Sequence, residues 1–127
     1  MVLGIGIDLC TVARMQKELD APEHGFLETV FTAAEIAHGE SRPHPAEHFA
    51  ARFAAKEATL KALAGSGASG SFWLDIEVAS AGDGAPRLVL HGRARDIADE
   101  LGVRQWHVSL SHDRQLATAT VIAEGAP

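Results

Sequence analysis

The fold is decided by the stretch Ala51-Arg52-Phe53-Ala54-Ala55-Lys56-Glu57-Ala58-Thr59-Leu60-Lys61-Ala62-Leu63. It contains neither Gly nor Pro and only one β-branched residue, and its Ala, Leu, Lys and Glu residues lose little side-chain freedom in a helix. We therefore expect a long central helix, beginning near Pro45 and ending at residue 63 or 64. Its inward face is marked by apolar residues at helical spacing: Phe49, Phe53, Leu60 and Ala64.

Two charged residues fall on the same predicted face, because Glu57 and Lys61 follow Phe53 by four and eight positions. Charges on an apolar stripe are unfavourable unless they are paired. One interpretation is an ordinary i, i+4 surface pair, which contributes about 0.2–0.5 kcal/mol. The other is a site in which Glu57 holds a metal or a proton and Lys61 faces an anion. Spacing alone leaves both open.

The N-terminal segment Val2–Leu9 alternates as a strand does, with its large apolar residues on one side. The other side carries only Gly4, Gly6 and Asp8. Glycine within a strand often marks the close approach of another backbone or of a ligand. Asp8 ends this strand, either as a turn-capping residue or as a functional carboxylate.

Composition limits the class of protein. The chain has 127 residues, a formal charge of −6 and 46% hydrophobic residues, which predicts one globular domain spanning residues 1–127. We expect no nucleic-acid partner, because binding to the phosphate backbone of a nucleic acid requires a basic surface. No apolar run is long enough to span a membrane. The single Cys10 and the absence of a signal-peptide pattern favour the cytoplasm.

The remaining segments predict an α+β fold in which an antiparallel sheet packs against the long central helix. We expect helices over 12–19, from a capping box at Thr32–Glu35, and over 93–101. We expect strands over 72–79, 87–90, 106–111 and 116–123.

Two further features are ambiguous. Arg14 and Lys17 lie on the outer side of the helix expected over 12–19, as a solvated face or as a docking patch. The loop that begins with Gly65, Ser66 and Gly67 is either a flexible connection or a set of backbone N–H groups turned toward an anion.

The polar residues at the ends of these elements suggest a reaction class. Asp8 and Glu57 supply the oxygen ligands that Mg²⁺ prefers, and substrate phosphates usually complete its coordination. Lys61 would balance charge or protonate a phosphate leaving group. Ser111 and His112 end another strand. Together these residues outline phosphoryl-transfer chemistry.

Four segments closely resemble the holo-[acyl-carrier-protein] synthases, the small class of 4′-phosphopantetheinyl transferases. They are Gly4-Ile5-Gly6-Ile7-Asp8, the run Arg52–Ala58 followed by Lys61, Asp75-Ile76-Glu77-Val78, and Val108-Ser109-Leu110-Ser111-His112. The resemblance covers nearly the whole chain in order. It implies the fold of that family and transfer of phosphopantetheine from coenzyme A to a serine of an acyl carrier protein, releasing adenosine 3′,5′-bisphosphate.

The resemblance also implies roles for individual residues. Asp8 and Glu57 would be the Mg²⁺ ligands, and Lys61 would contact the phosphate. Arg52, Ser111 and His112 would hold phosphates of coenzyme A, and Pro86 and Arg87 would lie near its adenine. The loop of Gly65, Ser66 and Gly67 would also contact coenzyme A. Arg14, with Lys17 nearby, would dock the acidic carrier protein. The base for the serine hydroxyl stays open between Glu57, Asp8 and a metal-bound water.

Members of the family are homotrimers with sites between subunits, and a small domain with few ligands of its own fits such a site. The Gly/Ser-rich loop after Gly65 departs from the family pattern, and the charge of −6 fits an acidic partner poorly. Two other functions are considered: a non-catalytic trimeric protein of the same fold that holds coenzyme A or a carrier domain, and a Mg²⁺-dependent nucleotide hydrolase.

Overall fold

The computed structural model describes residues 1–63, 70–80 and 84–127. Its strands are β1 (Val2–Thr11), β2 (Ile76–Ser80), β3 (Pro86–Leu90), β4 (Gln105–His112) and β5 (Leu116–Glu124). Its α-helices are α1 (Val12–Asp20), α2 (Phe26–Val30), α3 (Ala33–Glu40), α4 (Pro45–Ala62) and α5 (Gly92–Leu101). Short 3₁₀ helices span Pro22–His24 and Gly70–Asp75.

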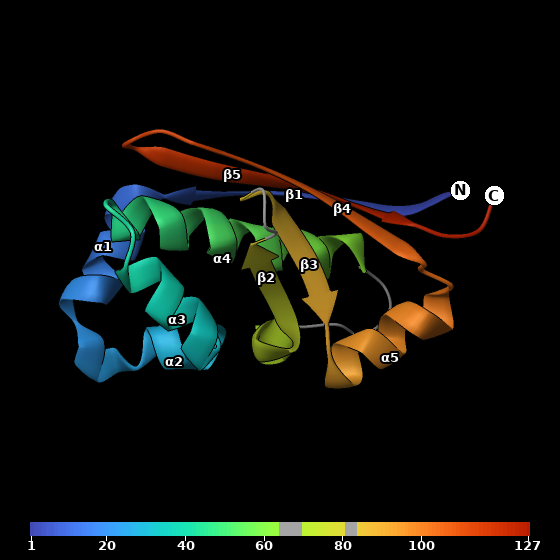
Figure 1. Cartoon of the computed structure of the whole chain (residues 1–127), viewed down its shortest axis with the longest axis horizontal. Coiled ribbons are helices and arrows are strands. Elements are labelled where there is room, and N and C mark those ends of the chain that lie inside the picture. The colour runs from blue at the N-terminus through green and yellow to red at the C-terminus, as the bar shows by residue number, and fades with distance from the viewer. Residues whose placement is uncertain (64–69, 81–83) are drawn as a thin grey trace.

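The three longest strands form one antiparallel sheet in the order β1-β5-β4, and β2 pairs with β3 in a separate two-stranded ladder. Figure 1 shows the three-stranded sheet as one layer with α4 directly beneath it. Helices α2, α3 and α5 lie below α4, and β3 crosses in front of it. This is the expected α+β arrangement of an antiparallel sheet against a long helix. Both chain ends meet at one end of the sheet, where the Met1 amino group donates to the carbonyl of Ala126 (3.0 Å).

Helix α4 is buried around most of its circumference because it lies between these layers (Figure 1). Phe49 and Phe53 are buried, as predicted. The prediction that Glu57 and Lys61 both share the inward face is wrong: Glu57 is half-buried at the helix edge and Lys61 is exposed. The buried charge is instead Lys56, which is fully inaccessible.

The glycines of β1 explain how the strand lies on α4. A Cβ atom at Gly4 or Gly6 would overlap the carbonyl oxygens of Ala62 and Ala58, respectively. The close approach predicted from these glycines is therefore confirmed, and the approaching group is a helix backbone. The opposite side of β1 faces outward, and its apolar residues are exposed: Leu3, Ile5, Ile7 and Leu9.

Capping residues fix the helix boundaries. Thr11 Oγ1 accepts from the Arg14 N–H at the start of α1 (3.3 Å). Thr32 and Glu35 form the predicted capping box at α3. Gly102 ends α5 with a φ of 85°, which a residue with a side chain adopts at a penalty.

One expected strand begins later than predicted. The segment from Phe72 to Asp75 is part of a 3₁₀ helix, and β2 starts only at Ile76. The Phe72 and Trp73 side chains pack against the core from this turn. None of the helices in the described ranges is long and apolar enough to cross a membrane.

Candidate active site

The contact between β1 and α4 brings Asp8, Glu57 and Lys61 together. Lys61 Nζ donates to Asp8 Oδ1 (2.9 Å) and to the Ile7 carbonyl (3.0 Å). Burial raises the pKa of Glu57, and the nearby Asp8 carboxylate raises it further. The Trp73 indole, Lys61 and Arg14 lower that pKa and only partly offset the rise. The three residues therefore form one electrostatically coupled cluster.

The bare face of β1 is the reason for this geometry. Because Gly4 and Gly6 let the strand lie on the helix backbone, Asp8 reaches the turn of α4 that carries Glu57 and Lys61. The surface-pair interpretation predicts an ion pair between Glu57 and Lys61, whereas Lys61 pairs with Asp8.

The chemistry of this cluster fits a hard divalent cation. It offers carboxylate oxygens from two residues, and the nearby Cys10 is buried, which raises the pKa of its thiol and disfavours the thiolate form that binds metals. Within the described ranges no three His, Cys, Asp or Glu side chains converge as a metal site. A donor set of two carboxylates suits Mg²⁺, which keeps several waters and takes phosphate oxygens from its substrate.

A second group of predicted residues lies elsewhere on α4. Arg52 and His112 line a pocket of about 540 Å³ between α3, α4, β2 and β4. Glu47 is the one acid among its described lining residues and contacts His112 Nδ1 (3.2 Å). The other lining residues are mostly basic or histidine: His38, Arg42, Pro43, His44, His48, Ser80 and Gly84. This pocket suits an anion.

The pKa values of two side chains in this pocket, His48 and Arg52, are lowered. Burial lowers the pKa of His48 to about 3, with further lowering by Arg52, His38, Arg42 and His112. The imidazole of His48 is therefore neutral near neutral pH. Burial, with Arg42, also lowers the pKa of Arg52. Arg52 still carries its positive charge, because a guanidinium is effectively always protonated in proteins.

The two clusters lie on opposite sides of α4. Arg52 and Lys61 are nine positions apart on one helix, which is about two and a half turns. Within one chain, the anion pocket and the carboxylate cluster therefore face away from each other.

The remaining predicted residues are spread over the surface. Ser111 and His112 point to opposite faces of β4, because successive side chains alternate along a strand. Pro86 and Arg87 line a third pocket of about 540 Å³, together with Arg104 and Trp106. Gly65, Ser66 and Gly67 lie outside the described residues.

Arg14 and Lys17 are exposed on α1, as predicted. The Arg14 guanidinium lies 5.4 Å from the centre of the Phe53 ring. Because Phe53 lies one turn before Glu57 on α4, this basic face of α1 borders the carboxylate cluster.

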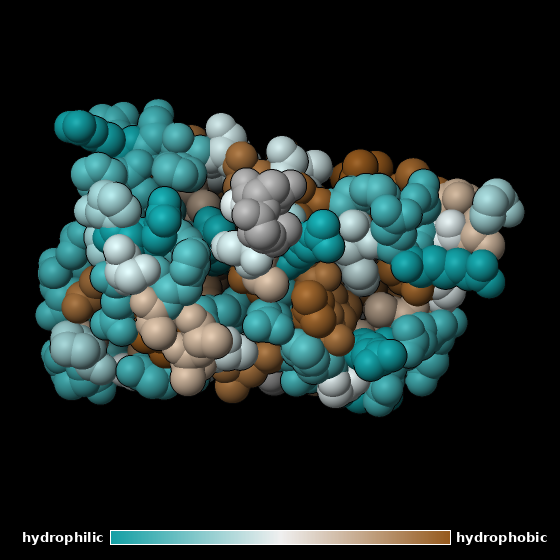
Figure 2. All heavy atoms as spheres, viewed as in Figure 1, coloured by the Kyte–Doolittle hydropathy of each residue, from teal (hydrophilic) through white to brown (hydrophobic). Residues whose placement is uncertain are grey.

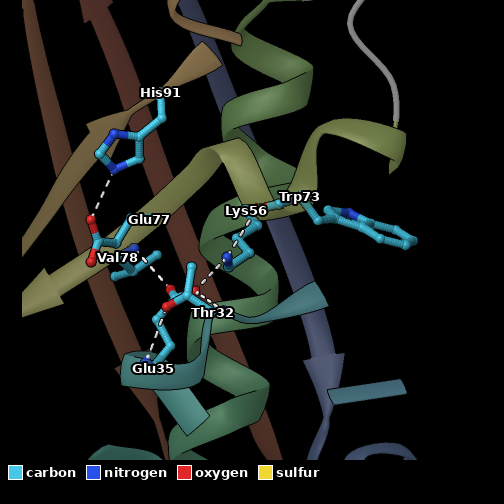
Figure 3. A network of polar contacts seen from close by, with 7 residues as sticks. All are labelled: Thr32, Glu35, Lys56, Trp73, Glu77, Val78 and His91. Atoms are coloured by element: carbon cyan, nitrogen blue, oxygen red, sulfur yellow. Dashed lines mark hydrogen bonds and ion pairs between the residues drawn. The ribbon is translucent and has the colours of Figure 1, made fainter. Parts of the chain in front are cut away.

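Sequence reasoning missed the role of Lys56. Its ammonium donates to Glu35 Oε1 (2.8 Å) and to the Trp73 carbonyl (2.9 Å), and Glu35 Oε2 accepts from the Val78 N–H (3.0 Å), as Figure 3 shows. The available signal was spacing: Lys56 follows Phe53 by three positions and precedes Leu60 by four, which places it on the apolar side of the helix.

The chain has a small α+β fold with two carboxylates and a lysine where a glycine-rich strand meets the central helix. This combination places it in a class of phosphoryl-transfer proteins. The family model of the 4′-phosphopantetheinyl transferase superfamily matches residues 4–121. The chain belongs to this superfamily.

The sequence is similar to individual relatives over almost their full length. The chain is 48% identical to the holo-[acyl-carrier-protein] synthase of Anaeromyxobacter dehalogenans strain 2CP-1 over 128 residues, covering 98% of each chain. It is 43% identical to that of Koribacter versatilis over 124 residues, covering 98% of this chain and 99% of the relative.

Solved structures give the same picture. The holo-[acyl-carrier-protein] synthase of Neisseria meningitidis superposes with a TM-score of 0.85 at 26% identity, covering 98% of this chain and 99% of that one. The synthase of Bacillus anthracis, solved in complex with CoA (3′,5′-ADP), superposes with a TM-score of 0.77 at 33% identity and 99% coverage of both chains.

Proposed function

We propose that this chain, as one domain, transfers the 4′-phosphopantetheine group of coenzyme A to a serine hydroxyl of an apo acyl carrier protein, in a Mg²⁺-dependent reaction. The names of its relatives support the reaction, and a synthase solved with CoA supports the donor. The observation that carries the proposal is the junction of Asp8, Glu57 and Lys61 where β1 lies on α4.

The reaction exchanges one P–O bond for another. The serine oxygen forms a bond to the phosphorus that carries the pantetheine arm, and the bond from that phosphorus to the bridging pyrophosphate oxygen breaks. The serine proton leaves to a base, and adenosine 3′,5′-bisphosphate departs with the bridging oxygen. Charge builds up on this oxygen, so a cationic donor beside it lowers the barrier.

Each residue of the cluster would have a separate role in this reaction. Asp8 and Glu57 would hold Mg²⁺, which neutralises phosphate charge when bound. Lys61 Nζ, exposed beside Asp8, is free to turn toward the leaving oxygen and to give it a hydrogen bond or a proton. The pocket lined by Arg52 and His112 would hold phosphate at the nucleotide end, and Pro86 and Arg87 would lie near the adenine.

One coenzyme A molecule cannot use both sides of α4 in a single chain. We infer that the site forms between two copies, with the Lys61 side of one chain facing the Arg52 side of the next. Such a contact joins two different surfaces, and repeated contacts of this kind form a ring when the rotation between subunits closes. Because the family that the chain resembles forms homotrimers with sites between subunits, we propose a ring of three.

The outer face of the sheet is suited to the centre of such a ring. Ile5, Ile7 and Leu9 have exposed fractions of 64%, 59% and 59%, and a contiguous apolar face of this kind marks an interaction surface. Figure 2 shows hydrophobic residues along the upper margin of the molecule, where Figure 1 places the strands.

The carrier protein would dock at Arg14 and Lys17, next to the carboxylate cluster. An overall charge of −6 opposes an acidic partner, so binding would depend on these local charges and weaken with added salt. We place the reaction in the cytoplasm, in keeping with the single, buried Cys10.

The test is the mass of an apo acyl carrier protein after incubation with the chain, coenzyme A and Mg²⁺. A gain of one phosphopantetheine group, lost when EDTA is added, supports the proposal. Binding of coenzyme A with no gain on several carriers would instead favour a non-catalytic binding protein. Release of nucleotide without any carrier would favour a hydrolase.

A further inference from the structure

A buried ion pair anchors the segment that follows the central helix. Lys56 is fully inaccessible and Glu35 is 8% exposed, and their charged atoms lie 2.8 Å apart. Glu35 also accepts from the backbone N–H groups of Thr32 (2.9 Å) and Val78 (3.0 Å). A buried charge pair with satisfied partners holds its surroundings in one arrangement.

The same ammonium fixes the backbone of Trp73. Lys56 Nζ donates to the Trp73 carbonyl (2.9 Å). In Figure 3 the Trp73 indole extends away from the ion pair. Its ring packs against Phe53, with 5.9 Å between the ring centres. Phe53 and Glu57 are one turn apart on α4 and lie on the same face, so the indole sits beside the carboxylate cluster.

The indole N–H of Trp73 has an unusual environment. It is buried, and no described residue accepts a hydrogen bond from it. Buried polar groups are nearly always bonded, so an exception requires an explanation. The Trp73 ring packs on Phe53, which precedes Glu57 by one turn on the same face of α4, so this N–H lies on the side of the helix that carries the Glu57 carboxylate. Hydrogen bonds at catalytic sites are often long without ligand and shorten in the complex.

We propose that Trp73 is a positioning residue whose indole N–H donates to one oxygen of Glu57 when a divalent cation is bound, turning the other oxygen toward Asp8 and the cation. The Lys56–Glu35 pair holds the backbone of Trp73 in place for this contact. The inference rests on the metal site of the proposed function and adds a residue that orients one of its ligands. Groups that orient metal ligands commonly change metal affinity by about 10–100-fold when they are removed.

The test compares two neighbouring aromatic residues. Trp73→Phe keeps an aromatic ring but removes the donor, whereas Phe72→Leu loosens packing in the same 3₁₀ helix and leaves the donor in place. Binding of Mn²⁺ is measured by electron paramagnetic resonance with coenzyme A present and no carrier protein, so that no turnover occurs. We expect Trp73→Phe to weaken Mn²⁺ binding about tenfold and Phe72→Leu to change it less than about twofold.

A third variant removes the N–H alone. Replacing Trp73 with benzothienylalanine keeps the two-ring shape but has sulfur in place of the N–H, so it also serves if Trp73→Phe folds poorly. Its Mn²⁺ affinity should fall with that of Trp73→Phe. Wild-type affinity in this variant, or equal losses in it and in Phe72→Leu, overturns the inference. If the wild-type chain with coenzyme A binds no Mn²⁺, the metal site of the proposed function is itself wrong.

Discussion

Gly6 of β1 packs so closely on the carbonyl oxygen of Ala58 in α4 that no side chain fits between them. This contact lays the strand along the helix and delivers Asp8 to Lys61. The glycine pattern near the N-terminus is therefore a packing requirement of the site.

Gly6→Ala should both destabilise the chain and reduce its activity. The added methyl group must push β1 away from α4, and overpacking of this kind usually costs about 1–3 kcal/mol. Urea unfolding measures the loss. The matched control is Gly25→Ala, where φ is 69° and an added Cβ meets nothing within 4 Å, so its penalty of about 1 kcal/mol comes from the backbone alone. Equal losses would show that Gly6 is not a tight contact.

Removing either carboxylate charge should abolish transfer without unfolding the chain. Asp8→Asn and Glu57→Gln keep the side-chain shape but take away the charge that would hold Mg²⁺, so we expect activity to fall at least about 100-fold. Carrier mass gain gives the rate, and circular dichroism checks the fold. Glu100→Gln, at a residue whose side chain is 71% exposed, is the control. Wild-type turnover in Asp8→Asn or Glu57→Gln would remove that residue from the metal site.

The sequence predicted the long helix and the capping box, and it predicted that another backbone or a ligand approaches the glycines of β1, because each depends on local residue type or spacing. It also singled out Asp8, Glu57 and Lys61. Spacing alone does not decide between Lys56 and Glu57 as the buried charge, because burial around α4 depends on layers formed by distant segments. The separation of Arg52 from Lys61 follows from helix geometry once the sheet is known to cover one side.

A mixed-subunit experiment tests the site between chains. Lys61→Ala and Arg52→Ala should each be nearly inactive alone, because every site lacks one side. When the two variants are unfolded and refolded together in equal amounts, about a quarter of the sites in a random ring combine an intact Lys61 with an intact Arg52. Activity should recover to about that fraction of wild type. No recovery in mixed trimers would mean that both residues act within one chain.

Reversing the charge of Arg14 should affect only the carrier protein. Arg14→Glu puts a negative charge on the exposed face of α1, so the KM for the carrier should rise about tenfold or more while the KM for coenzyme A stays unchanged. Initial rates at varied concentrations of each substrate separate the two. Arg95→Glu, on the exposed side of α5, controls for total charge. If KM for coenzyme A rises equally, Arg14 contacts the donor instead.

His48 should make the folded chain sensitive to acid. Its pKa is lowered from 6.5 to about 3 by burial and by the nearby Arg52, His38, Arg42 and His112. Between these two pH values the unfolded chain binds a proton at this residue that the folded chain does not bind. The free energy of unfolding therefore falls as the pH drops through this window, and the contribution is fully present above pH 6.5.

His48→Gln removes the imidazole that takes up this proton. Its free energy of unfolding should therefore fall less than that of wild type between about pH 7 and about pH 5. Urea unfolding at both pH values gives the difference, and His24→Gln, at a side chain that is 65% exposed, is the control. A phosphate bound in the pocket lined by Arg52 and His112 should offset the positive charges around His48 and so raise the pKa of its imidazole. NMR titration of the ring protons with and without adenosine 3′,5′-bisphosphate would detect this rise. An identical acid response in wild type and His48→Gln would show that His48 takes up its proton in the folded chain as readily as in the unfolded one.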